Sequence, residues 1–268
     1  METFFKTTDG YQMHYEYFKH PTATQTILFL GGLTQTTMAW HAYVPKFSQK
    51  YNILLLDLIF QGKSDEAEKH RSFEHHAQDV MNLAKFLECP VINLVGISYG
   101  SAVALRILKH YPQSINKAVL MSAFAHKPPF FEAISYSWKR ALAVGGYDLL
   151  LDVMLPHVLG KSYFEKPIIP IEKLKELRKE NPPSITRLQK LMQATEESGN
   201  YLRDIVSVKT PTLLLAGEED FLCTPNMHRD IAVAMQKARV KVIGRKGHTL
   251  NLEAIPETTK EIEQWLSA

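Results

Sequence analysis

The chain has 268 residues, of which 45% are hydrophobic and 22% are charged. This composition is typical of a folded globular protein and excludes a disordered or low-complexity chain. The formal net charge is only +3, and the sequence contains no long basic block. So small an excess of positive charge argues for a small molecule as the partner and against nucleic acid.

The two cysteines, Cys89 and Cys223, are too few for a disulfide framework or a four-cysteine metal site. A reducing cytoplasm is therefore the expected compartment. The opening residues METFFKTTDG lack the basic and apolar segments of a secretory signal. No uninterrupted apolar run reaches the length of about 18 residues that a bilayer span needs. We predict a cytoplasmic protein without stable membrane insertion, present as a monomer or homodimer.

The first predicted element is a β-hairpin. Phe4 and Phe5 precede the turn Thr8-Asp9-Gly10, and hydrophobic and polar residues alternate from Tyr11 to Tyr17. A period of two residues is typical of a strand with one buried face.

Short continuous apolar runs recur along the rest of the chain, and each is typical of a strand covered on both faces. They occupy residues 27–30, 53–56, 91–95, 118–121 and 212–215, with a weaker copy at 240–243. Helical patterns alternate with these runs, at residues 72–87 with Ser72 as the cap, at 101–111 and at 255–266. This alternation predicts an α/β protein with a mostly parallel central sheet flanked by helices.

Residues 125–208 break the alternation, because they contain helical patterns and no strand pattern. One helix is expected over residues 171–180 and a second one after Ser184, which can cap it. We therefore assign residues 1–124 and 209–268 to a core and residues 125–208 to a helical lid (cap) inserted between core strands. The mixed acids and bases of residues 171–180 predict a solvated helix face.

The sequence Gly96-Ile97-Ser98-Tyr99-Gly100 lies between a predicted strand and a predicted helix. A serine at such a sharp turn projects above the edge of the sheet, and flanking glycines leave room for the backbone. Ser98 is therefore the candidate nucleophile.

A serine hydroxyl needs a base, and the base needs an acid that orients it. His248 lies in the loop after the last strand, and Asp220 lies in the loop after residues 212–215. Parallel strands bring their carboxyl ends to one edge, so these two side chains can meet Ser98 there. The chain order Ser, Asp, His agrees with a known serine-hydrolase layout. Glu219 and Glu218 are the alternative acids.

Acyl chemistry also needs donors for a developing oxyanion. The backbone N–H of Tyr99, directly after the serine, is one candidate, and the N–H of Leu33 in the loop Gly31-Gly32-Leu33-Thr34 is the other. In the lid, Phe130, Phe131 and Trp138 predict an apolar substrate pocket, although packing within the lid would explain them equally well.

These motifs resemble the α/β-hydrolase superfamily over nearly the whole chain. Ser98, Asp220 and His248 fall on its triad positions, and the helical insertion matches its lid. Further matching stretches are Gly31-Gly32 followed by Trp40, and Asp57-Leu58 followed by Gly62-Lys63-Ser64.

Two positions depart from the superfamily pattern. Gly31 stands where a histidine is usual, and Phe60 stands where a glycine is common. Gly31-Gly32 with Thr36-Thr37, together with residues 57–64, is similar to a narrower group, the acyltransferases that use hydroxyacyl thioesters and build the lipid part of rhamnolipids.

The sequence predicts a lidded serine hydrolase that cleaves the acyl (carboxylic ester) bonds of small or medium, largely apolar substrates through a Ser-His-Asp triad and an acyl-enzyme. Three alternatives stay open: an acyltransferase that uses hydroxyacyl thioesters, a carbon–carbon bond hydrolase or lyase, and a non-catalytic ligand-binding relative. The sequence has neither a Gly-x-Gly-x-x-Gly after its first strand nor a P-loop, and no cofactor or metal is expected.

Overall fold

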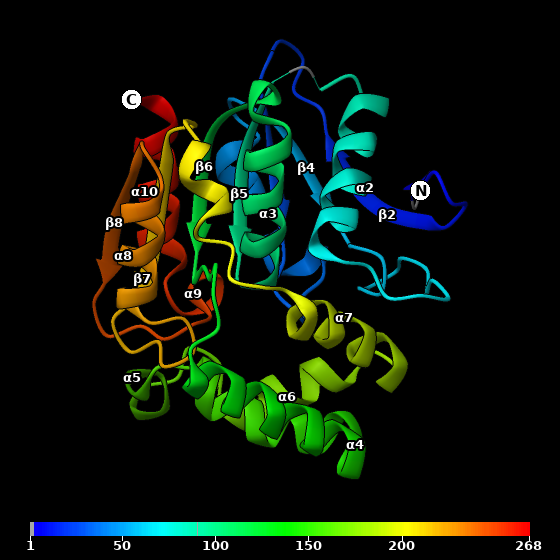
Figure 1. Cartoon of the computed structure of the whole chain (residues 1–268), viewed down its shortest axis with the longest axis vertical. Helices are drawn as coiled ribbons and strands as arrows, with labels where there is room; N and C mark the ends of the chain where they lie inside the picture. Colours follow the sequence, from blue (N-terminus) through cyan, green and yellow to red (C-terminus); the bar gives the residue numbers. More distant parts are fainter. Residues whose placement is uncertain (1–2, 90) are drawn as a thin grey trace.

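A central β-sheet organises the protein (Figure 1). The computed structural model describes residues 3–89 and 91–268; Met1 and Glu2, at the start of the predicted core, and Pro90 lie outside this range. Eight strands form the sheet in the described part of the chain. They are β1 (Thr3–Lys6), β2 (Gln12–Phe18), β3 (Thr26–Leu30), β4 (Asn52–Leu56), β5 (Ile92–Ile97), β6 (Ile115–Met121), β7 (Thr212–Gly217) and β8 (Ala238–Ile243).

The strand order is β1-β2-β4-β3-β5-β6-β7-β8. β1 pairs antiparallel with β2, and β2 pairs antiparallel with β4, while every later pair is parallel. The predicted hairpin and the mostly parallel α/β sheet are both confirmed. All carboxyl ends of the parallel strands consequently lie at one edge.

Helices cover both faces of the sheet, which is why the central strands are apolar throughout. One face carries α2 (Phe73–Phe86), α3 (Tyr99–His110) and α8 (Pro225–Ala234), and the other carries η1 (Thr37–Trp40), α1 (Val44–Phe47) and α10 (Ile255–Ser267). Within β3, Leu28 and Leu30 join the first buried cluster, and Ile27 and Phe29 join the second. Alternate side chains of one strand thus fill two separate cores. The remaining short helices near the core are η2 (Pro112–Ser114), η3 (Asp204–Ser207) and α9 (Leu250–Glu253).

Two predicted helix starts are confirmed by their caps. The Ser72 side chain accepts a hydrogen bond from the His75 N–H at the start of α2. In the same way, the Ser184 side chain accepts one from the Arg187 N–H at the start of the helix that follows it. Each cap satisfies a first-turn N–H that has no partner within the helix.

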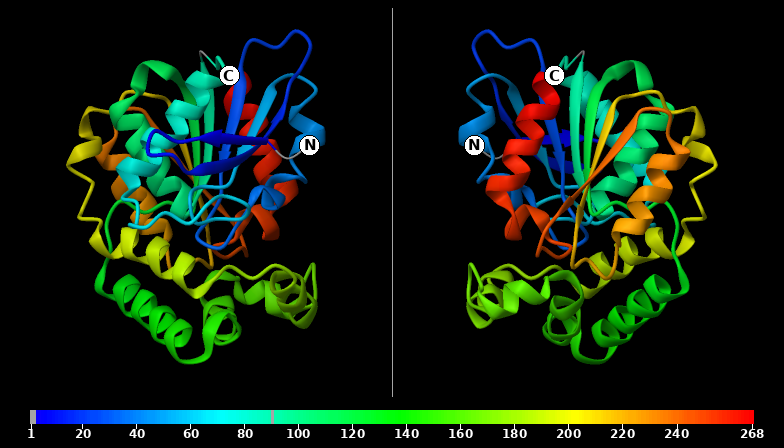
Figure 2. Two further views of the ribbon diagram at one scale, coloured as in Figure 1. Left: turned by 90° about the vertical axis from the view of Figure 1, so that its right-hand side faces the viewer. Right: turned by 90° about the vertical axis from the view of Figure 1, so that its left-hand side faces the viewer.

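Between β6 and β7 the chain forms, besides the short η3, four α-helices and, over the described residues 125–208, no strand. They are α4 (Pro129–Val158), α5 (Lys161–Glu165), α6 (Ile171–Lys179) and α7 (Ile185–Glu197). Figure 2 shows them gathered at one end of the core, beyond the sheet. This arrangement is the one expected of a lid, and its role as a lid stays a prediction.

By length and composition alone, α4 could cross a membrane. It is not one regular helix, however, because the backbone leaves helical geometry at Gly146 (φ 65°, ψ −156°). Leu142, Leu150 and Leu151 of α4 are also fully buried in the larger core cluster. These apolar residues of α4 therefore pack inside the fold.

Candidate active site

Ser98 occupies a strained turn between β5 and α3. Its backbone has φ 52° and ψ −114°, a conformation that side chains rarely adopt. A Cβ at Gly100 would lie 2.3 Å from the carbonyl oxygen of Leu30, and a Cβ at Gly96 would lie 2.9 Å from that of Gly100. The two glycines therefore permit the close backbone approach that lifts Ser98 above the sheet.

The three side chains singled out from the sequence form one hydrogen-bonded chain. Ser98 Oγ lies 2.8 Å from His248 Nε2, and His248 Nδ1 lies 2.9 Å from Asp220 Oδ2. Asp220 and His248 are both buried, and Asp220 Oδ1 also accepts the N–H groups of Leu222 and Cys223. A hydroxyl held against an imidazole, which a buried carboxylate orients, can lose its proton to that imidazole.

The two alternative acids lie elsewhere. Glu219 accepts hydrogen bonds from the Ser162 N–H and hydroxyl, each at 2.8 Å, and the Ser162 N–H is the main cause of the lowered pKa of its carboxyl. Glu218 accepts the Arg245 N–H at 2.8 Å. Asp220 is thus the acid of this loop that the structure brings to His248.

The loop that carries His248 is held in place by one side chain, Glu253, that the sequence analysis did not identify. Buried Glu253 of α9 accepts the N–H groups of Gly160 and Gly247 at 3.0 Å and of Thr249 at 3.2 Å. Burial raises the pKa of this carboxyl, and the three N–H donors oppose the rise. The sequence signal was a single acid in residues 250–254, where Asn251 is the other polar residue.

The two predicted oxyanion donors line the same cavity as Ser98. Tyr99 is the first residue of α3, so its N–H has no partner within the helix. The N–H of Leu33 has no hydrogen-bond partner among residues 3–89 and 91–268. The Gln61 side chain holds the Leu33 loop by donating to the Gly32 carbonyl at 2.8 Å. Both donors are therefore available to a ligand.

The loop after β4 explains one departure from the superfamily pattern. Phe60 has φ 78°, a region that favours glycine, and its ring is fully buried. Nearby, a Cβ on Gly62 would overlap the carboxylate of Asp57, which accepts the Thr37 N–H at 2.8 Å and the Lys63 N–H at 3.1 Å. Burial of the ring offsets the backbone strain of Phe60.

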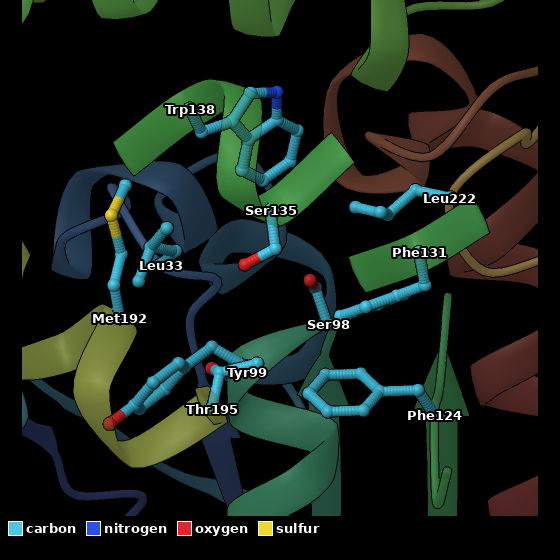
Figure 3. Close-up of a pocket in the computed structure, with 10 residues that line it drawn as sticks. All are labelled: Leu33, Ser98, Tyr99, Phe124, Phe131, Ser135, Trp138, Met192, Thr195 and Leu222. Atoms are coloured by element: carbon cyan, nitrogen blue, oxygen red, sulfur yellow. The ribbon is translucent and has the colours of Figure 1, made fainter. Parts of the chain in front are cut away.

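We call the first of two cavities at Ser98 the apolar arm. It has a volume of about 410 Å³, open space included. Figure 3 shows the Ser98 and Ser135 hydroxyls projecting into it among aromatic and aliphatic side chains. Its lining residues are Leu33, Ser98, Tyr99, Phe124, Phe131, Ser135, Trp138, Met192, Thr195 and Leu222.

The pocket prediction was wrong for Phe130. Its side chain is 62% exposed and does not line the apolar arm, whereas Phe131 and Trp138 are buried and do. Consecutive residues of a helix point about 100° apart, so Phe130 and Phe131 cannot share a face, while positions 131, 135 and 138 can.

The second cavity, the arginine arm, lies on the His248 side of Ser98 and has a volume of about 400 Å³, open space included. It is lined by Gly32, Leu33, Thr34, Gln35, Ile97, Ser98, Trp138, Met154, Val158, Arg178, His248 and Thr249. Arg178 belongs to α6, which the sequence analysis assigned to solvent. The charge pattern did not reveal that this one side chain faces the cavity.

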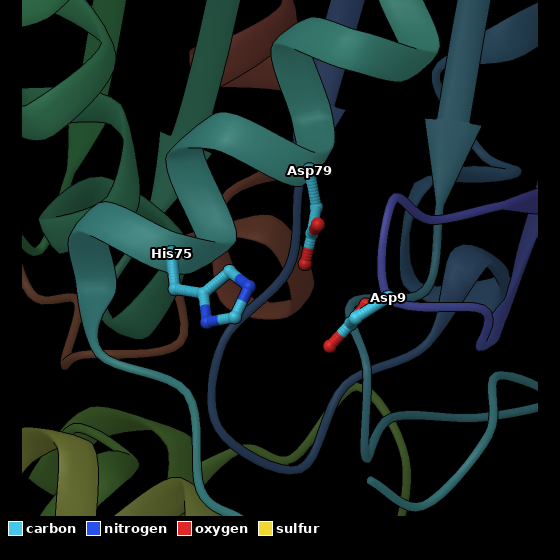
Figure 4. Close-up of side chains that lie close together, drawn as sticks. All are labelled: Asp9, His75 and Asp79. Carbon is cyan, nitrogen blue, oxygen red and sulfur yellow. The ribbon is translucent and has the colours of Figure 1, made fainter.

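A cluster of possible metal ligands lies away from the two arms. Ligand atoms of Asp9, His75 and Asp79 lie within 4.8 Å of one another (Figure 4). Arg71 already occupies this cluster, because its guanidinium donates to both Asp9 oxygens at 2.9 Å, lies 3.3 Å from Asp79 and contacts His75. A guanidinium thus supplies the positive charge that a metal ion would bring.

A family model and a solved structure both agree with an α/β-hydrolase fold for this chain. Residues 25–143 match the family model of the alpha/beta hydrolase fold. An alpha/beta hydrolase enzyme from a Medee basin deep-sea metagenome library superposes with a TM-score of 0.91 at 25% identity, covering 99% of this chain and 98% of that one.

Two curated bacterial relatives are similar over most of the chain. The uncharacterized hydrolase YugF of Bacillus subtilis is 22% identical, covering 96% of this chain and 93% of its own length. The (R)-3-hydroxydecanoyl-ACP:CoA transacylase of Pseudomonas aeruginosa is 23% identical, covering 91% and 81%.

Proposed function

We propose that this chain, which has the α/β-hydrolase fold, is a serine hydrolase of carboxylic esters with small or medium, largely apolar acyl groups. The hydrogen-bonded chain from Ser98 through His248 to Asp220 carries this proposal. These three residues are far apart in the sequence, and in the structure they form the nucleophile, base and acid that acyl transfer requires.

In the first step, Ser98 Oγ attacks the carbonyl carbon while His248 Nε2 takes its proton. His248 then donates this proton to the leaving alcohol as the carbon–oxygen bond breaks and the acyl-enzyme forms. Water, deprotonated by His248, attacks the acyl-enzyme in the second step and releases the carboxylic acid and Ser98.

Asp220 keeps the Nδ1 proton of His248 directed toward its carboxylate, so that Nε2 faces Ser98 as a base. Its negative charge also stabilises the imidazolium that forms after proton transfer. The N–H groups of Leu33 and Tyr99 would stabilise the negative oxygen of the tetrahedral intermediate, and their lack of other partners supports this role.

The apolar arm supports an apolar acyl group as the substrate's buried part. Phe124, Phe131 and Trp138 supply aromatic surface directly beside Ser98. Each methylene of an acyl chain placed there would contribute about 0.8 kcal/mol to binding. The reaction rate should therefore rise with acyl length until the arm is filled.

Acyl transfer from hydroxyacyl thioesters is the second candidate. The similarity to the P. aeruginosa transacylase over 91% of this chain favours it. The apolar arm also contains the hydroxyl groups of Ser135 and Thr195, which could bind a hydroxyl on the acyl chain. Transfer would differ only in the second step, where another acceptor replaces water.

A series of p-nitrophenyl esters from C2 to C16, assayed beside hydroxyacyl thioesters, tests both candidates. Hydrolysis predicts release of free acid, with a rate maximum at one chain length and no activity in Ser98→Ala. Transfer predicts acylated acceptor as the main product when a thiol or alcohol acceptor is added. Ester turnover that persists unchanged in Ser98→Ala would contradict both.

A further inference from the structure

Helix α6 carries four basic residues, and three of them have carboxylate partners. Lys173 pairs with Glu176, Lys175 with Asp152 and Glu172, and Lys179 with Asp148. Arg178 has no carboxylate partner in the described part of the chain. It is the basic residue of this helix that lines the arginine arm.

The contacts of Arg178 hold its guanidinium in place without neutralising it. Arg178 donates a hydrogen bond at 3.0 Å to the Thr34 hydroxyl, in the loop that carries Leu33. Burial raises the pKa of the Tyr147 hydroxyl, and the positive charge of the neighbouring Arg178 opposes the rise. Both partners are uncharged, and a guanidinium has five N–H donors, so donors remain for a ligand.

A half-buried positive charge without a counter-ion is costly unless a ligand supplies one. Carboxylates and phosphates fit a guanidinium best, because two of their oxygens can accept parallel hydrogen bonds. The arginine arm thus has the charge and the donor geometry of an anion site.

His248 shows which part of a substrate enters this arm. In the proposed mechanism His248 donates its proton to the leaving group, so the leaving group lies on the His248 side of Ser98. His248 and Arg178 line the same cavity, and neither lines the apolar arm. An anion at Arg178 would therefore belong to the leaving group.

We propose that Arg178 binds a carboxylate or phosphate on the leaving group, so that the preferred substrates are esters or thioesters that join an apolar acyl group to an anionic alcohol or thiol. This inference rests on the proposed function, which describes the acyl group of the substrate, and adds the chemical class of the leaving group.

Matched substrate pairs test this. Butyrate esters of 3-hydroxy-4-nitrobenzoate and of its neutral carboxamide share the acyl group and the nitrophenol chromophore and differ in one carboxylate. Butyryl thioesters of 4′-phosphopantetheine and of pantetheine differ in one phosphate. The ratio of kcat/KM within each pair measures the preference for the anion, and the two pairs distinguish carboxylate from phosphate.

The variants are Arg178→Gln, which removes the charge, and Lys179→Gln, a neighbouring control whose ion pair with Asp148 is exposed. We expect Arg178→Gln to lower kcat/KM for at least one anionic substrate by about 10- to 100-fold, mainly through KM, because it removes charge-assisted hydrogen bonds. The neutral substrates should change less than about threefold, and Lys179→Gln should leave both ratios unaltered. Arg178→Lys should restore part of the preference.

Equal losses on the anionic and neutral substrates in Arg178→Gln would overturn the inference, because Arg178 would then only hold the Leu33 loop. An unchanged ratio in both pairs would overturn it as well. The proposed function would survive either result, since it fails only if the wild-type protein hydrolyses none of the four substrates, or hydrolyses them without Ser98.

Discussion

Two buried polar clusters each include a residue of the serine turn, and similar residue types behave differently in them. The His248 cluster comprises Ser98, Asp220, His248 and Glu253. The His76 cluster comprises Arg71, His76, Asp79 and Tyr99, and its His76 and Tyr99 rings lie 5.7 Å apart. Each contains a histidine and an aspartate that are almost inaccessible to solvent.

The clusters differ in their hydrogen bonds. Both ring nitrogens of His248 face a partner, at 2.8 and 2.9 Å. Neither ring nitrogen of His76 has a hydrogen-bond partner among the described residues. The Asp79 carboxylate accepts no hydrogen bond there either, and its ion-pair partner Arg71 lies 3.3 Å away. Burial lowers the pKa of His76 to about 3 and raises that of Asp79 to about 7. A buried histidine without hydrogen-bond partners therefore stays neutral and does not take up a proton. A buried histidine held between a hydroxyl and a carboxylate is prepared for proton transfer.

The comparison is tested most strongly by removing the reacting groups of the His248 cluster. Ser98→Ala and His248→Ala should each lower kcat on any active ester by at least about 10³-fold, because both act in bond breaking. Circular dichroism and thermal unfolding should show a folded protein in both. Activity within about tenfold of the wild type would assign the chemistry elsewhere.

The next largest effect is expected at Asp220. Asp220→Asn should lower kcat by about 10²- to 10³-fold, because an amide can favour the wrong imidazole tautomer. Glu219→Gln is the matched control in the same loop and should keep nearly full activity. The reverse ranking of these two variants would make Glu219 the functional acid.

A smaller effect should follow from loosening the His248 loop. Glu253→Gln replaces a carboxylate that accepts three N–H groups by an amide with one acceptor oxygen. We expect kcat to fall about tenfold with little change in KM, and stability to fall by about 1–3 kcal/mol. Glu257→Gln, on the exposed surface of α10, is the control. A Glu253→Gln protein that is destabilised but retains full kcat would limit Glu253 to a structural role.

The His76 cluster should affect stability and its pH dependence but not turnover. Because the folded protein holds His76 neutral, protons bind the unfolded chain preferentially as the pH falls below about 6.5. As the pH falls from 6.5 to 5, the free energy of unfolding of His76→Phe should therefore rise relative to that of the wild type by about 1.4 kcal/mol for each pH unit. Urea unfolding at several pH values measures this difference, and parallel curves would contradict it. Ester kcat should stay within about twofold.

Much of the core was predictable because its signals are local. Apolar runs are long enough to form strands buried on both faces, and Gly96 and Gly100 flank a serine where the backbone needs space. The order of Ser98, Asp220 and His248 then places them at one edge, since parallel strands end there.

The missed features depend on tertiary contacts. Arg178 has the charge pattern of a surface helix, and only the packing of α6 over the sheet edge directs it to Ser98. Phe130 and Phe131 are identical in sequence terms, and the rotation of α4 decides which one is buried. Glu253 gains its role from Gly160, 93 residues away.

Covalent labelling of the folded wild-type protein with a fluorophosphonate probe tests the central claim most directly, with intact mass and peptide mapping as the measurement. An activated serine predicts one adduct per chain, on Ser98, absent in Ser98→Ala and much slower in His248→Ala. Unlabelled folded protein, or an adduct on a different residue, would contradict the assignment of Ser98 as the nucleophile.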